Sequence, residues 1–383
     1  MNSSSMLYWL LSQVLHPYVP AFRVFGYITT RIALASLTAL VLSLALGPWL
    51  IRQLQDLSFG QHIREDGPKS HQKKAGTPTM GGLLMVISII VPTLLWSNLA
   101  NQYIWIALLG FMAFGIIGFI DDYKKVVKKR NLGLTARQKF WGQVAAAMLV
   151  GFLLLLLHAN QAYSTAVNVP FLKQFHPDLL IEPLTKNFWT YPLAFAPFYI
   201  FIVFIMVGSS NAVNLTDGLD GLATGLMIIA SGATTALAYV SSHAEISRYL
   251  GLARLPNSQE LTIFCASMVG ATLGFLWYNC HPAEVFMGDV GSLSLGGGLG
   301  VVAVLIKQEI LLVFIGGVFV IEALSVILQV GSYKLRGGKR IFKMAPIHHH
   351  FEALGWPESK VIVRFWIAGL VMALFALTTL KLR

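Results

Sequence analysis

Residues 103–125 have the sequence YIWIALLGFMAFGIIGFIDDYKK, and this stretch decides the fold. Its first 18 residues carry no charge and come close to the ~20 apolar residues that a helix needs to cross a bilayer. Two aspartates and two lysines follow almost at once. The stretch therefore predicts a membrane-spanning helix that ends at a charged, water-facing border.

The same pattern recurs along the chain. Of its 383 residues, 56% are hydrophobic and 12% are charged, and the mean hydropathy is +0.67, whereas a soluble domain has about 25% charged residues. We therefore expect an all-α integral membrane protein in which residues 1–383 form a single polytopic domain. The apolar stretches predict ten transmembrane helices, at about 24–50, 79–97, 103–120, 138–158, 191–209, 221–241, 259–278, 290–306, 310–332 and 361–380.

The basic residues predict the orientation. Nineteen of the 28 Lys and Arg residues fall in alternate loops or the helix ends beside them, and such loops are cytoplasmic by the positive-inside rule. Both termini are then periplasmic, and residues 159–190 form an external loop. The net charge of +11 reflects this topology, so we expect the lipid bilayer as a partner and no nucleic acid. The loops expected in the cytoplasm are 51–78, 121–137, 210–220, 279–289 and 333–360.

Several other functions lack their sequence signals. The two cysteines, Cys265 and Cys280, have no zinc-ligand spacing and lie in or beside apolar segments, which argues against a zinc site or a structural disulfide. No GxxxxGK[ST] run is present, which disfavours a P-loop ATPase. No internal repeat supports an inverted-repeat transporter.

Four polar motifs fall on the predicted cytoplasmic side. Asp121-Asp122 follows the third span, and the stretch 211–221 follows the fifth. Asp289 stands between two glycines before the eighth span, and three histidines follow the ninth. We therefore expect an active site in a cytoplasmic cleft.

Each motif also has a structural interpretation. Asn214, Asp217 and Asp220 are spaced i, i+3 and i+6, which puts them on one helical face. A functional role is favoured there, because uncompensated polar groups are costly at a membrane border. For the Asp121-Asp122 pair, a functional role and simple solvated charge at a helix end fit the sequence equally well. Asp289 fits a helix N-cap, with or without a ligand-binding role.

The histidines and one buried acid complete the candidates. Three consecutive histidines do not share a helical face, so we do not expect them to hold one zinc ion and favour contact with a phosphate or sugar. Glu322 lies within the ninth span, where an acid is a functional hypothesis. Pairing with Gln329, two helical turns away, is the structural alternative, and both stay open.

Carboxylates, lysines and glycine-bounded turns on one face suit a magnesium-bound diphosphate. Mg²⁺ prefers oxygen ligands and is usually held by one or two carboxylates and by substrate phosphates. Lysine and arginine neutralise the remaining phosphate charge.

These motifs, together with Gly76-Thr-Pro-Thr-Met-Gly-Gly82, resemble those of the phospho-N-acetylmuramoyl-pentapeptide transferases, a family of bacterial membrane enzymes. The aspartate pair and the Asn-x-x-Asp-x-x-Asp series alone indicate the wider polyprenyl-phosphate N-acetylhexosamine-1-phosphate transferase superfamily. The Gly76–Gly82 stretch and the Pro346–His350 element narrow the resemblance to the muramoyl-pentapeptide branch, and it covers nearly the whole chain.

The resemblance implies a reaction and a location. Phospho-MurNAc-pentapeptide would pass from UDP-MurNAc-pentapeptide to undecaprenyl phosphate, giving lipid I and UMP, with Mg²⁺ as cofactor. This is the first membrane step of peptidoglycan synthesis, at the bacterial inner membrane. A homodimer is suggested by the resemblance only.

The resemblance also implies residue roles. Asp289 would be the metal ligand, and Phe286 would stack on uracil. Direct attack by the lipid phosphate and a covalent route through Asp121 are both open. The residues expected in catalysis are Asp121, Asp122, Asp289 and His348, and those expected to bind substrate are Lys74, Thr79, Lys125, Lys129, Asn214, Asp217, Asp220, Asn279, Phe286, Gln329 and His349.

Two alternatives remain at this point. A UDP-GlcNAc:polyprenyl-phosphate GlcNAc-1-phosphate transferase of the same superfamily should lack the histidine element. An ion-coupled transporter is motivated by ten spans and Glu322, but its site is expected near the bilayer midplane, whereas these acids lie at cytoplasmic helix ends.

Overall fold

The computed structural model describes residues 6–58, 77–127, 133–170, 172, 175–186 and 190–381. Within them one isolated bridge joins Ala166 and Asp178, and the regular structure is helical. The helices are α1 (Met6–Trp9), η1 (Leu10–Leu15), η2 (Pro20–Gly26), α2 (Ile28–Ser58), α4 (Gly82–Trp96), α5 (Gln102–Val127), α6 (Ala136–Ala159), η3 (Glu182–Lys186), α7 (Tyr191–Thr216), α8 (Leu222–Ser242), α9 (Ala244–Leu250), η4 (Pro256–Gln259), α10 (Leu261–Asn279), α11 (Gly288–Leu305), α12 (Glu309–Ile315), α13 (Gly317–Leu335), α14 (Ile347–Ala353) and α15 (Glu358–Thr378).

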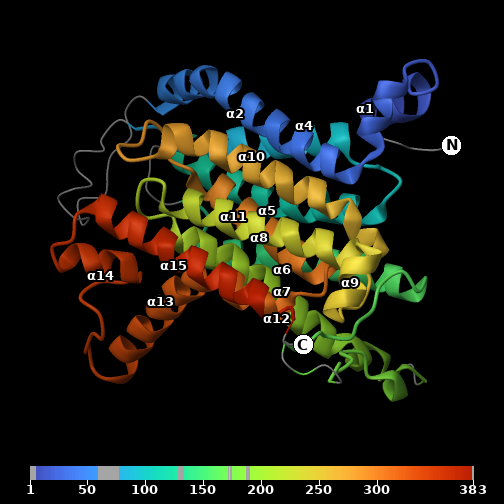
Figure 1. Cartoon of the computed structure of the whole chain (residues 1–383). Coiled ribbons are helices and arrows are strands. Elements are labelled where there is room, and N and C mark those ends of the chain that lie inside the picture. The colour runs from blue at the N-terminus through green and yellow to red at the C-terminus, as the bar shows by residue number, and fades with distance from the viewer. Residues whose placement is uncertain are drawn as a thin grey trace.

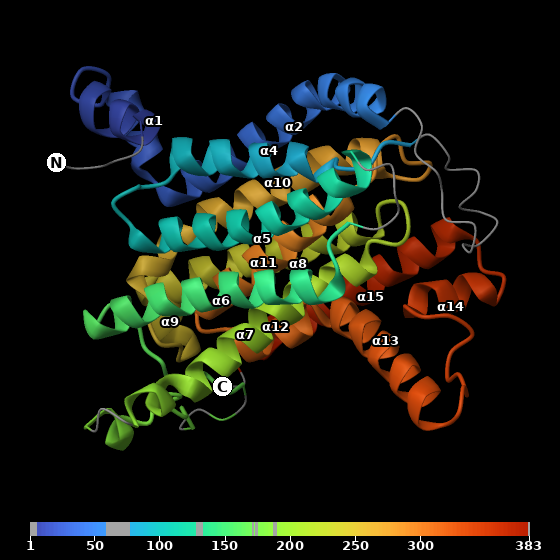
Figure 2. The same ribbon diagram turned by 180° about the vertical axis from the view of Figure 1, so that it is seen from behind.

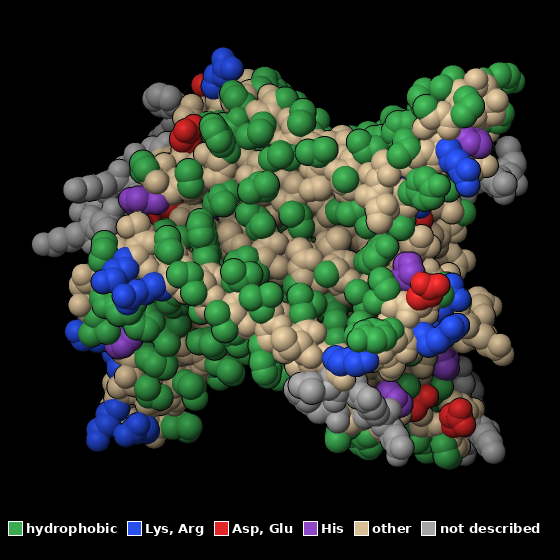
Figure 3. Space-filling model, viewed as in Figure 1, with side chains coloured by type: hydrophobic (Ala, Val, Ile, Leu, Met, Phe, Trp, Pro, Cys, Tyr) green, Lys and Arg blue, Asp and Glu red, His purple; other side chains and the backbone are tan. Residues whose placement is uncertain are grey.

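Nine helices in the described part of the chain have the length and composition of membrane spans: α2, α5, α6, α7, α8, α10, α11, α13 and α15. The apolar helix α4 is shorter, at 15 residues. Charged side chains gather toward the two sides of the view in Figure 3, and apolar side chains cover much of the middle. The prediction of an all-α integral membrane protein is therefore confirmed.

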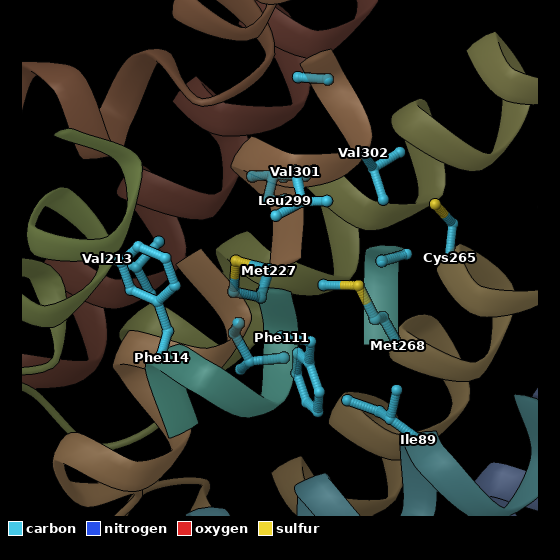
Figure 4. Packing of buried hydrophobic residues seen from close by; sticks show 14 of the residues in the cluster. Ile89, Phe111, Phe114, Val213, Met227, Cys265, Met268, Leu299, Val301 and Val302 are labelled. Atoms are coloured by element: carbon cyan, nitrogen blue, oxygen red, sulfur yellow. The ribbon is translucent and has the colours of Figure 1, made fainter. Parts of the chain in front are cut away.

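Helix α11 lies at the centre of the bundle. Every residue from Val290 to Leu305 is buried, and α11 packs against α4, α5, α7 and α8. In the view of Figure 1, helices α8 and α10 lie in front of α11. In the opposite view of Figure 2, helices α5 and α6 lie in front of it. Figure 4 shows the shared core, where Phe111 and Phe114 of α5 point toward residues of α7, α8, α10 and α11.

The predicted ninth span, 310–332, is wrong as one continuous helix. The structure divides it into α12 and α13, and Gly316 separates them. Two adjacent glycines, Gly316 and Gly317, explain the break, because glycine is a poor residue for a helix interior. Helix α13 then projects obliquely from the bundle (Figure 2).

The second span also begins later than predicted. Residues 77–80 are not helical, and Met80 has a φ of 73°, which is rare for a residue other than glycine. Helix α4 therefore starts at Gly82. The non-helical residues 77–80 are free to run beside the segment that precedes α11.

The far end of α11 carries a buried ion pair. Lys307 Nζ lies 2.9 Å from Glu309 Oε1, and both side chains are almost fully buried. Because α11 has 18 residues, a helix length of roughly 27 Å separates this pair from the start of α11.

Candidate active site

Three carboxylates meet where α5 ends and α11 begins. The ligand atoms of Asp121, Asp122 and Asp289 lie within 4.8 Å of one another. Lys125 Nζ contacts all three, at 2.5 Å from Asp121 Oδ2, 3.2 Å from Asp122 Oδ1 and 3.0 Å from Asp289 Oδ2. Asp121 and Asp122 are only 3% and 1% exposed, so the alternative of a solvated pair is wrong.

Helices α6 and α7 bring two further groups to Asp289. Lys139 Nζ lies 2.9 Å from Asp289 Oδ2. The Asn214 amide donates to Asp289 Oδ1 at 2.6 Å and to Ser292 Oγ at 2.8 Å. Lys139 was not among the sequence candidates, although a lysine at the second position of the predicted span 138–158 is a signal that could have found it.

Close backbone packing explains why these carboxylates converge. A Cβ atom on Gly118 would overlap the carbonyl group of Asp289, so the backbones of α5 and α11 are in contact there. This contact lies one helical turn before Asp121 and Asp122 of α5. The Val290 amide then donates to Asp122 Oδ2 at 3.0 Å. This places Asp122 at the N-terminus of α11, where the helix dipole favours negative charge.

The segment before α4 forms another wall of the site. The Phe286 amide donates to the Pro78 carbonyl, and the Gly81 amide donates to the Phe286 carbonyl, each at 2.9 Å. This pairing places Thr79 beside Gly288, which has a φ of +71°. A Cβ atom on Gly288 would lie 2.6 Å from Asp122 Oδ2 and 2.9 Å from Thr79 Oγ1.

The expectation that Asn214, Asp217 and Asp220 share a helical face is wrong. Helix α7 ends at Thr216, and the chain turns through residues 217–221. Gly221, the residue before α8, has a φ of +79°, a conformation that glycine adopts without strain.

Asp217 lies beyond the last residue of α7. Its partial burial, followed by the negative charges of Asp289, Asp122 and Asp220, raises its pKa to about 7. A backbone hydrogen bond from Gly288 opposes the shift. This carboxyl therefore changes its charge near neutral pH, close to the acid cluster.

Asp220 belongs to a second group. Its Oδ2 lies 3.0 Å from His281 Nδ1 and accepts from the Ala283 amide at 3.2 Å. Its own amide donates to Glu358 Oε1 at 3.0 Å. These bonds join the 217–221 turn to the segment before α11 and to the start of α15. His281 and Glu358 were not sequence candidates.

The three histidines face different partners in the short helix α14. His348 Nδ1 lies 3.0 Å from Glu322 Oε2, and His349 Nδ1 lies 2.7 Å from Glu352 Oε2. His350 Nδ1 accepts from the Lys343 amide at 3.1 Å. The three Nδ1 atoms have different partners, although the rings of His348 and His349 contact each other, with centroids 4.1 Å apart.

Two expected substrate contacts have structural partners. The buried Asn279 donates to the Val285 carbonyl at 2.9 Å and accepts from the Thr224 hydroxyl at 2.7 Å. Gln329 donates to the Phe342 carbonyl at 2.9 Å and accepts from the amides of Ile341 and Phe342. Gln329 therefore holds the 336–346 loop, and the alternative of a Glu322–Gln329 pair is replaced by Glu322–His348.

The last expectations concern Asp289, Phe286, Lys74 and Lys129. Asp289 is the second residue of α11, and Met287 takes the N-cap position, so the N-cap interpretation of Asp289 is wrong. Phe286 is partly buried and precedes Asp289 by three residues. Lys74 and Lys129 lie outside the described residues, and no role follows for them from the structure.

Comparison with known proteins identifies relatives over the full chain. Residues 104–307 match the model of glycosyl transferase family 4. The chain is 66% identical to a protein of Solibacter usitatus and 64% identical to one of Koribacter versatilis. It is 53% identical to one of Thermodesulfovibrio yellowstonii. Each alignment covers 99% of this chain and 100% of the relative, and each relative is named phospho-N-acetylmuramoyl-pentapeptide-transferase. The resemblance found in the motifs is confirmed, and the chain belongs to the phospho-N-acetylmuramoyl-pentapeptide transferase family.

Proposed function

We propose that this protein transfers phospho-MurNAc-pentapeptide from UDP-MurNAc-pentapeptide to undecaprenyl phosphate, giving lipid I and UMP. Family membership over the full chain supports this reaction. The observation that carries it is the meeting of Asp121, Asp122 and Asp289 with two lysines at helix ends. The shared name of the relatives favours it over transfer from UDP-GlcNAc.

The proposal includes a topology. Helix α4 would be the tenth span beside the nine long helices. The basic loops would then face the cytoplasm of a bacterial cell with the acid cluster, and both termini would be periplasmic. This arrangement places the acids at the border between water, which carries the nucleotide, and the bilayer, which carries the lipid phosphate. We keep the single polytopic domain and the homodimer as parts of the proposal.

The residues present fit a magnesium ion. Lys125 Nζ touches all three carboxylates, so the cluster already accommodates a cation among oxygen atoms of the kind that Mg²⁺ prefers. Asp289 would be the principal ligand, with Asp121 and Asp122 beside it. When bound, the ion would supply positive charge to the diphosphate of the nucleotide substrate.

The protein's own groups would act mainly by positioning and charge. A lipid phosphate is largely ionised at neutral pH because its second pKa is near 6, so it needs little help from a base. Asp121 would orient the phosphate or take its remaining proton. Lys125 and Lys139 would neutralise the diphosphate, and phosphoryl transfer depends largely on such effects.

The neighbouring residues would bind the rest of the substrate. Phe286 would stack on uracil, and Asn214, Asp217 and Asp220 would line the nucleotide side. His348 and His349 would contact the sugar phosphate or the peptide. Attack by the lipid phosphate and a covalent route through Asp121 give the same product, and only the covalent route leaves a phosphoenzyme that can be trapped during turnover.

A release assay tests the proposal. Purified protein is incubated with UDP-MurNAc-pentapeptide, undecaprenyl phosphate and Mg²⁺, and UMP and the lipid product are measured. We expect both products, and neither when EDTA replaces Mg²⁺. UMP release from UDP-GlcNAc, without release from UDP-MurNAc-pentapeptide, would contradict the proposed substrate.

A further inference from the structure

Glu322 and His348 form an isolated, fully buried pair. Both residues are 0% exposed, and His348 Nδ1 lies 3.0 Å from Glu322 Oε2. Among the described residues, no aligned hydrogen bond reaches either carboxylate oxygen or either ring nitrogen. Because a buried carboxylate without compensation is costly, His348 is the group that compensates Glu322.

The contacts fix the orientation of the His348 ring. Its Nδ1 faces Glu322 on α13, and its Nε2 faces Gly218 so closely that a Cβ atom there would overlap it. Gly218 belongs to the 217–221 turn, next to Asp217. The pair therefore joins α13, a helix that projects from the bundle, to the turn beside the acid cluster.

His349 repeats the arrangement. Its Nδ1 lies 2.7 Å from Glu352 Oε2, and its Nε2 would lie 3.3 Å from a Cβ atom on Gly218. The two rings are in edge contact, with centroids 4.1 Å apart. Each histidine thus presents Nδ1 to a glutamate and Nε2 to the same turn. Two different glutamates therefore face two adjacent histidines in the same way, which favours a shared function over chance packing.

A carboxylate facing Nδ1 has a known chemical consequence. It orients the imidazole ring and keeps the Nδ1 edge turned toward the acid. The partner therefore decides which group the Nε2 edge packs against. Glutamine keeps the shape of glutamate but lacks this negative charge.

We propose that Glu322 is a positioning residue that fixes the ring orientation of His348, so that the Nε2 edge of the ring holds the 217–221 turn in place beside the acid cluster. The inference rests on the proposed function, because that function places Asp217 and Asp220 of this turn on the nucleotide side of the substrate. Glu322 itself touches no substrate in this account and acts through His348.

Kinetics of three variants provide the first test. We expect Glu322→Gln to lower kcat for UMP release by about 10- to 100-fold, as for other residues that orient a functional histidine. We expect the double variant E322Q/H348Q to be no slower than H348Q alone, because residues that act as a unit are not additive. Glu322→Asp keeps the charge and should recover part of the activity. Unchanged kcat in E322Q, or additive losses in the double variant, would overturn the proposal.

Glu309→Gln is a matched control. Glu309 is also fully buried and paired with a cation, Lys307, but it lies at the far end of α11. We expect E309Q to lower the melting temperature while kcat stays near that of the unmodified protein. Equal losses of kcat in E309Q and E322Q would show general damage and would overturn the specific role of Glu322.

A spectroscopic measurement separates this inference from the proposed function. The full-length protein is labelled with ¹⁵N-histidine in nanodiscs, and the His348 resonances are assigned as those absent from His348→Gln. We expect His348 ring signals that shift in E322Q and not in E309Q. Unchanged His348 signals in E322Q overturn the inference even if lipid product forms. Absence of UMP release by the unmodified protein refutes the proposed function and leaves this test valid.

Discussion

Asp289 connects the helices that form the candidate site. Its carboxylate contacts Lys125 of α5, Lys139 of α6 and Asn214 of α7. Those three helices and α11 are therefore linked through one carboxylate. A change that removes this charge should alter catalysis more than it alters the fold, since the apolar core of the bundle stays unchanged.

We expect Asp289→Asn to lower Mg²⁺-dependent UMP release by at least about 100-fold, the usual cost of losing one group that stabilises a transferring phosphoryl charge. UMP is measured over a range of Mg²⁺ concentrations. Asp178→Asn is the control, because Asp178 lies in the loop between α6 and α7 and bonds Thr165. Near-normal activity of D289N at any Mg²⁺ concentration would contradict the metal assignment.

Asp217 should make stability depend on pH. Burial and neighbouring acids raise its pKa to about 7, so the folded protein holds this proton more tightly than the unfolded chain does. The resulting stabilisation is complete at pH values below the ordinary aspartate pKa and is lost as the pH rises through about 7.

We therefore expect the melting temperature in detergent and EDTA to fall between pH 5 and pH 8, and to fall less for Asp217→Asn. Thermal unfolding of both proteins across this range provides the measurement. Parallel curves for the two proteins would show that Asp217 does not titrate there.

At the level of helices, the contact between α5 and α11 sets the site. Gly118 allows this contact, because any side chain there would meet the carbonyl of Asp289. We expect Gly118→Ala to push α5 away from α11, to reduce the free energy of unfolding by about 1–3 kcal/mol and to abolish most UMP release.

Gly142→Ala is the matched control for G118A. A Cβ atom on Gly142 would lie 3.5 Å from the Ile117 side chain, an ordinary contact distance, so stability and UMP release should both be kept. Equal effects of the two substitutions, measured by thermal unfolding and UMP release, would mean that the α5–α11 approach is not what the site requires.

For the whole molecule, the two cysteines report the orientation. Cys280 is exposed just after α10, and Cys265 is buried within α10. If the 279–289 loop is cytoplasmic, a membrane-impermeant maleimide should label inside-out vesicles and not intact spheroplasts. Cys280→Ser should remove the label. Labelling of intact spheroplasts at Cys280 would reverse the proposed topology.

The membrane fold and the motifs of the site could be predicted from the amino-acid sequence. Span length, apolar composition and the distribution of Lys and Arg are local properties of the chain, so they need no knowledge of packing. Asp121, Asp122 and Asp289 could likewise be selected because each acid follows or precedes an apolar stretch. The family resemblance rested on motifs of the same local kind.

Which of these groups come into contact depends on the tertiary structure. Lys139 and Asp289 are 150 residues apart in the chain, and their contact depends on the packing of α5 and α7 against α11 and of α6 against α5 and α7. The break at Gly316 and the turn at 217–221 follow from glycines whose conformation the surroundings select. The Glu322–His348 pair forms because α13 and α14 fold against the 217–221 turn. The periodicity within a single helix instead suggested a pair between Glu322 and Gln329.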